Sequence, residues 1–282
     1  MALTRSVPAN LRYATRRLLR GRSSSLAMIL LLAVGIGGVV AVFSFVNALL
    51  LRPLPVRDPG QLAWIGTRDR TAGLQSSFTY PDFRALQDGG GPFSQVAAFG
   101  PQKVRLSVGS GAPTDAVGAF VSASYFPMLD VPPFRGRMLG GGTTTEVVLS
   151  HATWRGRFAA DPGIIGRTIS LNGVPFTVVG VAPPAFGGTI SLVRLEFWIP
   201  LEAYSRVVSG GVLDTRNHRW LQVIGRVKPG LAITSVHPAL KGFEASLPGS
   251  PGLEGHPRVE VQPLAGLNGE ARTGVLRAAG LL

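Results

Sequence analysis

The sequence TISLNGVPFTVVGVAP, residues 168–183, decides the fold of the larger part of this 282-residue chain. Two runs rich in β-branched and aromatic residues flank the dipeptide Asn172-Gly173. Asparagine followed by glycine between two such runs is typical of a tight β-hairpin turn. The sequence therefore predicts two antiparallel strands that turn at Asn172-Gly173.

Short segments on both sides of this hairpin alternate between strand-like and helix-like composition. The strand-like runs are QLAWIGT, FSQVAAF, KVRLSV, TEVVLS, FWIPL and LQVIGRV, and GAFVSASYFPMLD predicts a strand that continues into a helix. The helix-like runs are YPDFRALQD, HATWRGRFA and the segment around residues 237–247. Mixed short elements of this kind predict an α+β fold.

A long apolar segment precedes this domain. Residues 26–51 read LAMILLLAVGIGGVVAVFSFVNALLL, with no charge and only Ser44 and Asn47 as polar side chains. As a helix the segment would rise about 39 Å, more than the roughly 30 Å of a bilayer's hydrocarbon core. A cleaved signal peptide has a shorter apolar region and a small-residue cleavage site, whereas LRPLP follows here. We therefore predict one N-terminal transmembrane helix over residues 26–51.

The charges that flank this helix predict its orientation. No acidic residue occurs before Asp58, and six arginines precede the helix: Arg5, Arg12, Arg16, Arg17, Arg20 and Arg22. Basic residues stay on the cytoplasmic side, so the N-terminus is expected in the cytoplasm and the main domain outside a cell inner membrane. Residues 1–25 either lie along the membrane surface as an amphipathic helix or serve only as a basic flank.

Small residues recur every four positions within the predicted helix, at Ala33, Gly37 and Ala41. This spacing allows another helix to approach closely in lipid, so it predicts a partner helix, although small residues are common in any membrane span. The two prolines of RPLP, residues 52–55, then end the helix. The predicted organisation is a cytoplasmic segment 1–25, a membrane helix 26–51 and an extracytoplasmic domain 52–270, with residues 271–282 following.

The chain lacks the residue patterns of the common catalytic and binding sites. The net charge of +13 is spread along the chain without a recognition motif, which argues against nucleic-acid binding. There is no cysteine, the four histidines are isolated in sequence, and neither GxxxxGK[ST] nor GxSxG occurs. We therefore expect no enzyme activity, metal site or cofactor. Asp82 with Arg84, and Glu196, are expected to be surface ion pairs or helix caps.

Six stretches carry a resemblance to a known family over about residues 10–235. They are LRYATRRLLR, VFSFVNALLLRPLP, FTYPDFRAL, GAFVSASYFPMLDVPPFRGRML, VVLSHATWRGRFAADPGIIGRTISLNGVPFTVVGVAP and RWLQVIGRVKPG. Together they resemble the N-terminal part of an FtsX-like ABC-transporter permease with a MacB-type periplasmic core domain, most closely the acidobacterial-type duplicated permeases. The resemblance implies a separate cytoplasmic ATP-binding subunit, further permease helices or a second permease copy as partners, and no catalytic residues.

The chain also departs from that family. Three more membrane helices normally follow the core domain, so residues 271–282 are expected to be the truncated start of a second membrane helix and the chain a fragment. GGGTTT at 140–145 replaces acidic residues of the family, and Ala232 replaces a serine cap, which predicts a helix starting at Thr234 or Ser235. The expected function is the permease part of an efflux or export system. The alternative is a single-span extracytoplasmic binding or regulatory protein without transport activity.

Overall fold

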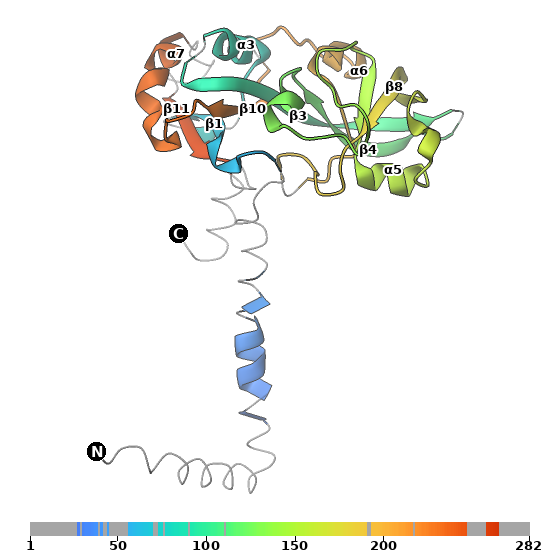
Figure 1. Cartoon of the computed structure of the whole chain (residues 1–282), viewed down its shortest axis with the longest axis horizontal. Coiled ribbons are helices and arrows are strands. Elements are labelled where there is room, and N and C mark those ends of the chain that lie inside the picture. The colour runs from blue at the N-terminus through green and yellow to red at the C-terminus, as the bar shows by residue number, and fades with distance from the viewer. Residues whose placement is uncertain are drawn as a thin grey trace, which may run out of the picture. The chain divides into compact units, whose positions relative to one another are not determined.

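A computed structural model shows the fold (Figure 1). It describes residues 27–28, 30–38, 40–41, 44, 56–69, 73–75, 77–89, 91–109, 111–190, 193–216, 218–246 and 258–264. The chain divides into two compact units, residues 1–51 and residues 52–282, and we call the second the sheet unit.

The described residues of the first unit are helical, and apolar side chains such as Leu31 and Val34 are exposed. Among the residues that the structure describes, no helix combines the length and the apolar character needed to cross a bilayer. The predicted membrane helix 26–51 extends outside the described residues and stays a prediction. The basic segment 1–25 and residues 271–282 lie wholly outside the described residues.

Among the described residues, eleven strands form one mixed sheet in the sheet unit. Their bounds are β1 (Leu62–Asp69), β2 (Gly73–Gln75), β3 (Phe93–Val108), β4 (Thr114–Val121), β5 (Arg135–Gly136), β6 (Glu146–Leu149), β7 (Thr168–Leu171), β8 (Val174–Val181), β9 (Phe197–Pro200), β10 (Gln222–Val227) and β11 (Arg258–Pro263). The order is β11-β1-β10-β3-β4-β9-β6-β8-β5, with β2 beside β1 and with β7 beside β3 and β8. The β4–β9 and β6–β8 pairs are parallel.

Short helices connect the strands. The α-helices are α3 (Tyr80–Asp88), α4 (Tyr125–Leu129), α5 (His151–Arg157), α6 (Tyr204–Val207) and α7 (Lys241–Ser246). The 3-10 helices are η1 (Pro59–Gln61), η2 (Pro162–Ile164), η3 (Leu201–Ala203), η4 (Ile233–Ser235) and η5 (His237–Leu240). The predicted α+β fold is confirmed. The predicted C-terminal helix is also present, but it begins as separate 3-10 turns because Pro238 lacks the backbone N–H that a continuous helix uses.

A hydrophobic cluster lies on each face of the sheet. Successive residues of a strand point to opposite faces. In β1, Leu62 and Trp64 accordingly join one hydrophobic cluster, while Ala63 and Ile65 join the other. The cluster of Leu62 and Trp64 includes the side chains of α4, and the other includes those of α3 and α6. Burial on both faces explains why several strands are continuous apolar runs in the sequence.

The predicted hairpin is confirmed, and its turn has a second role. Asn172 and Gly173 have φ values of 50° and 84°, as the tight turn between β7 and β8 requires. The Asn172 side chain accepts a hydrogen bond from the Arg105 amide at 2.8 Å and donates one to the Val207 carbonyl at 2.9 Å. The turn therefore also fastens β3 to α6.

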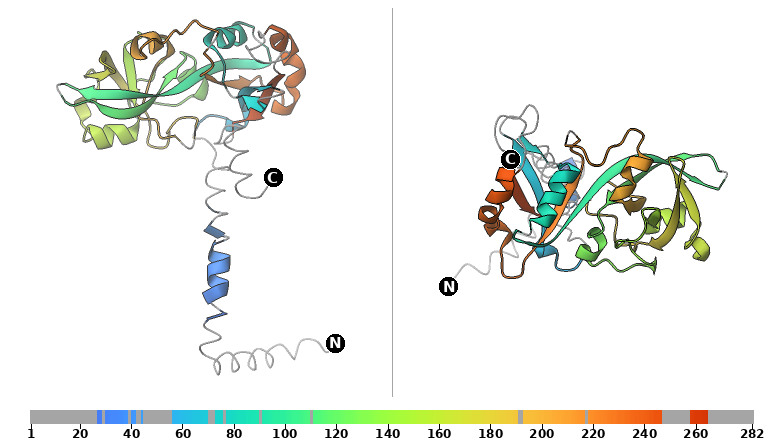
Figure 2. Two further views of the ribbon diagram at one scale, coloured as in Figure 1. Left: turned by 180° about the vertical axis from the view of Figure 1, so that it is seen from behind. Right: turned by 90° about the horizontal axis from the view of Figure 1, so that it is seen from above.

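The prediction of separate strands FSQVAAF and KVRLSV is wrong, because both belong to the 16-residue strand β3, which Figure 2 shows crossing the sheet unit. Pro101 lies within this strand although proline has no backbone N–H to donate. The backbone amide and carbonyl of Arg105 both bond to Asn172, on the side of β3 away from β4. Backbone N–H and C=O groups point to the same side at every second residue, so the backbone nitrogen of Pro101 also points away from β4. On that side, the pairing of β3 with β10 stops at Phe99 and its pairing with β7 starts at Leu106. Pro101 lies between them, so no ladder hydrogen bond is lost.

Of the two roles expected for Asp82, the helix cap is confirmed and the surface pair with Arg84 is wrong. Residues two apart on a helix do not face each other, and Arg84 instead lies 3.8 Å from Asp88. Asp82 is buried, with 2% of its side chain exposed, and forms a capping box with Thr79 at the start of α3. Its carboxylate lies 3.4 Å from Arg216 and 3.8 Å from Arg219. Burial lowers the pKa of Arg219, and the Asp82 carboxylate opposes that shift.

We expect Asp82→Ala to lower the free energy of unfolding by about 3 kcal/mol, because it removes a helix cap and leaves the largely buried Arg219 without its carboxylate. Chemical denaturation of the full chain in detergent, followed by tryptophan fluorescence, measures the change. Arg84→Ala on the same helix is the control and should stay within about 0.5 kcal/mol of the unchanged chain. Equal losses for the two variants would contradict this account of Asp82.

Candidate functional site: the clasp beside β1

The guanidinium of Arg226, on β10, joins three segments that are far apart in the sequence. It donates hydrogen bonds to the carbonyls of Met128 at 2.9 Å, Arg57 at 2.8 Å and Asp58 at 3.4 Å. Met128 lies in the last turn of α4, where carbonyls have no partner within the helix. Arginine suits this position because its planar fork carries five donors. Arg226 therefore ties β10, α4 and the segment that leads into β1 together.

Weaker contacts surround this centre. The Arg57 amide donates to the Leu129 carbonyl at 3.4 Å, and the Arg57 guanidinium lies 3.4 Å from the Asp130 carboxylate. Both side chains of this ion pair are more than half exposed, so the pair itself contributes little stability. We call the set of Arg57, Asp58, Met128, Asp130 and Arg226 the clasp. Its strength comes mainly from Arg226.

The last described strand of the sheet unit, β11, lies next to the first, β1. β11, which the sequence analysis did not predict, pairs with β1 from Ala63 opposite Pro263 to Arg68 opposite Arg258. The Leu264 amide extends this pairing by donating to the Leu62 carbonyl at 2.9 Å. The clasp and this ladder therefore fix residues 57–58 and 258–264 to the sheet.

An open groove of about 410 Å³ lies beside the clasp. Its lining residues are Phe126, Pro127, Asp130, Val131, Pro132, Pro133, Arg137, Met138, Leu139 and Gly140. Asp130 belongs to both the clasp and the groove, and its left-handed backbone (φ 51°) ends α4 there. Because they share this residue, a molecule bound in the groove would touch the clasp directly.

Arg137, which lines the groove, forms an ion pair with Glu146 at 2.5 Å. Only 10% of the Glu146 side chain is exposed, and its carboxylate also accepts from the Thr143 amide at 3.4 Å. The Arg137 hydrogen bond holds the pKa of Glu146 below its ordinary value. A Cβ at Gly142 would lie 2.5 Å from the Glu146 carboxylate, so glycine in the GGGTTT segment makes room for this ion pair.

The other polar residues singled out by sequence have structural roles. Glu196 binds Arg157 through two hydrogen bonds of 2.6 and 3.1 Å, which fastens α5 beside β9. His218 bonds the Tyr204 hydroxyl at 3.0 Å, and His151 packs on Trp154. Within the described part of the chain, no group of three or more histidine or acidic residues could hold a metal ion.

The small residues Ala33, Gly37 and Ala41 are helical and exposed. A Cβ added at Gly37 would meet no atom within 4 Å, so this position leaves room for another helix to approach. Their packing against a partner helix stays a prediction. The basic residues Arg12, Arg16, Arg17, Arg20 and Arg22 lie outside the described residues.

Arg226 was not identified from the sequence, where LQVIGRV indicated only a strand. A charged residue within an otherwise apolar strand is the one signal that pointed to it, because such a residue is seldom buried without partners. The site contains backbone carbonyls, the charged side chains of Arg57, Asp58, Asp130 and Arg226, and a mostly apolar groove. This arrangement joins three segments of the sheet unit beside an open groove.

Comparisons with known proteins place this geometry in context. The family profile described as MacB-like periplasmic core domain matches residues 25–243. The chain is similar in structure to a domain of a putative permease protein from Porphyromonas gingivalis, with 12% identity, a TM-score of 0.57, and coverage of 76% of this chain and 94% of that one. No curated protein sequence matches the chain.

Two further solved structures are similar. One is the periplasmic region of MacB from Actinobacillus actinomycetemcomitans, with 16% identity, a TM-score of 0.55, and coverage of 79% of this chain and 94% of that one. The other is the extracellular domain of the noncanonic ABC-type transporter YknZ from Gram-positive bacteria, with 17% identity, a TM-score of 0.52, and coverage of 71% and 99%. At these identities the likeness shows the fold.

We expect Arg226→Gln to speed amide exchange across residues 56–62 about tenfold, because hydrogen bonds to a charged group contribute about 1.5 kcal/mol or more. Hydrogen–deuterium exchange with mass spectrometry on the full chain in detergent measures the rate. The control is Arg105→Gln, which removes an exposed arginine from the neighbouring strand β3. Unchanged exchange in Arg226→Gln would show that other contacts hold this segment.

The Arg137–Glu146 pair predicts a dependence of stability on pH. A lowered pKa in the folded state contributes stability above the ordinary pKa of 4.5, and this stability is lost as the pH falls through the lowered value. Glu146→Gln should therefore lower Tm at pH ~7, and its difference from the unchanged chain should shrink below pH ~4. Thermal unfolding in detergent measures both. The control Asp115→Asn, in the exposed Lys103–Asp115 pair, should change Tm little at either pH.

Proposed function

Since the chain belongs to the family of MacB-like periplasmic core domains of FtsX-like permeases, we propose that it is a permease component of an ABC-type efflux or export system. A separate cytoplasmic subunit binds and hydrolyses ATP. Residues 26–51 anchor the chain in the inner membrane with the N-terminus in the cytoplasm. The sheet unit lies outside the membrane and moves in response to ATP hydrolysis, with no catalytic residues or cofactor of its own.

The clasp is the observation that carries this proposal. A device that transmits movement needs a stiff connection where the force arrives, and Arg226 fixes the carbonyls of Arg57 and Asp58 to β10 and α4. In β1, residues 62–65 pair with β10 on one side, and residues 63–68 pair with β11 on the other. Displacement of the segment before β1 is therefore passed to the whole sheet instead of being absorbed by a loop.

The second candidate is a single-span binding or regulatory protein, and the groove beside the clasp favours it. A groove of about 410 Å³ with mostly apolar walls, Asp130 and Arg137 is within the size range of small-ligand sites. Binding there would act on Asp130 of the clasp without any ATP-binding subunit. The two candidates thus share a site and differ in their partners.

Affinity capture of the full chain from native membranes distinguishes the two candidates. The permease proposal predicts recovery of an ATP-binding subunit, together with ATPase activity in the captured complex. Recovery of a stable extracytoplasmic partner without an ATP-binding subunit would overturn it in favour of the regulatory protein.

We also expect Gly37→Leu to reduce the recovery of partner membrane subunits at least several-fold, because a large side chain would block close helix approach. Gly35→Leu is a matched control, since two residues on a helix with 3.6 residues per turn point in nearly opposite directions. Quantitative mass spectrometry of the captured complexes measures recovery. Equal losses in both variants would contradict packing through the Ala33, Gly37 and Ala41 face.

A further inference from the structure

If residues 26–51 span the bilayer, the side of the sheet unit on which Val56 lies must be close to the membrane surface. Only residues 52–55 separate the predicted span from Val56, and an extended chain covers at most about 3.6 Å per residue. The five steps from Leu51 to Val56 therefore reach no more than about 18 Å. Val56 itself packs against a hydrophobic core of the sheet unit, so this side is fixed relative to the sheet.

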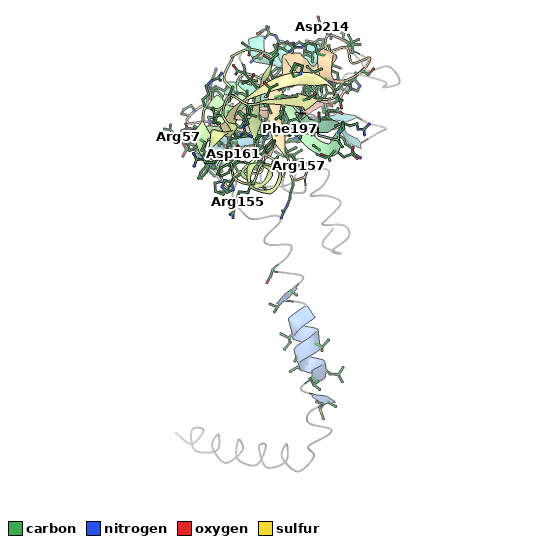
Figure 3. All side chains as sticks on the ribbon, turned by 90° about the vertical axis from the view of Figure 1, so that its right-hand side faces the viewer. Arg57, Arg155, Arg157, Asp161, Phe197 and Asp214 are labelled. Carbon is green, nitrogen blue, oxygen red and sulfur yellow. The ribbon has the colours of Figure 1, made fainter. Side chains whose placement is uncertain are left out.

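Helix α5 lies on that same side of the sheet unit. Figure 1 shows α5 and the segment leading into β1 along one edge of the unit, and Figure 3 shows Arg155 at this edge with Asp214 at the opposite one. The helix buries Thr153 and Trp154 and exposes Ala152 and Arg155. It therefore presents an exposed basic face.

An exposed aromatic ring and a second arginine extend this face. Phe134 is 45% exposed, and its ring centroid lies 4.9 Å from that of His151 and 5.6 Å from that of Trp154. The Arg135 guanidinium lies 5.9 Å from the Phe134 ring and 5.3 Å from the Trp154 ring. We call Phe134, Arg135, Ala152 and Arg155 the α5 patch. Its chemistry is cationic and aromatic.

The acidic groups near the α5 patch are already engaged. Asp161 pairs with Arg167 at 2.7 Å, and Glu196 pairs with Arg157 at 2.6 Å. Within the described ranges, neither Arg135 nor Arg155 has an acidic group within 4 Å. Two arginines without acidic partners beside an exposed phenylalanine are complementary to anionic headgroups at a membrane interface.

We infer that the α5 patch docks on anionic phospholipid headgroups of the bilayer in which the chain is anchored. The arginines bind headgroup phosphates, while Phe134 enters the interfacial layer, where aromatic rings are favoured. This contact would set the resting orientation of the sheet unit on the membrane. The inference rests on the proposed anchor, but it requires neither the ATP-binding subunit nor transport.

Site-specific labelling tests this contact, because the chain has no cysteine of its own. Ala152→Cys reports on the α5 patch and Asp214→Cys on the opposite edge, each carrying a nitroxide label in the full chain in nanodiscs. The discs contain phosphatidylcholine alone or phosphatidylcholine with phosphatidylglycerol, plus a lipid-attached nickel chelate that relaxes nearby nitroxides. We expect several-fold stronger relaxation at position 152 than at position 214, and only in the discs that contain phosphatidylglycerol.

Charge-removing variants identify the cause. Arg135→Gln with Arg155→Gln should abolish the difference between the two labels without changing Tm, whereas Lys228→Gln with Lys241→Gln removes two exposed charges elsewhere and should preserve it. The inference would be overturned by equal relaxation at both positions. It would also be overturned if relaxation at position 152 were the same with and without phosphatidylglycerol. Immobilisation of the position 152 label by a co-purifying protein without any response to lipid would overturn it as well. Because none of these readouts involves ATP, their failure is distinct from a failed capture of the ATP-binding subunit.

Discussion

The pairing of β3 is the constraint on which the rest of the sheet unit depends. This strand pairs with β10 at its beginning, with β4 along its middle and with β7 at its end. A shift of one residue would move every side chain of β3 to the opposite face and take its buried residues out of their hydrophobic clusters. The register is therefore fixed by both hydrophobic clusters at once. The hydrogen bonds between Asn172 and the backbone amide and carbonyl of Arg105 are a third constraint on the register of β3.

Constraints of this kind explain how the fold persists at low sequence identity. The solved structures that share it have only 12–17% identity to this chain, with TM-scores of 0.52–0.57. Two-sided burial asks for apolar residues of suitable size at many positions and leaves their identities open. Arg226 and Asp82 differ from these apolar positions, because their polar side chains bond segments that are distant in the sequence. At such positions in this chain the fold depends on a particular side chain.

The sequence predicted the elements whose signals are local. Helix α3 carries its own capping box, and the β7–β8 hairpin carries its own turn, so both were confirmed at the expected residues. The unbroken strand β3 and the edge strand β11 could not be predicted, because each depends on which strands lie beside it. The partners of Asp82 and Arg226 were missed for the same reason: Arg219 and Met128 are distant in sequence, and only the fold brings them near.

The pairing of β11 with β1 determines how the stretch between them connects to the rest of the chain. Ala63 and Pro263 are partners on adjacent strands, so the whole stretch between them leaves and rejoins the rest of the chain at points only about 5 Å apart. Insertion of a domain into a host protein is tolerated when its ends are close together. A link of about one or two residues would therefore close the gap left if this stretch were removed or replaced.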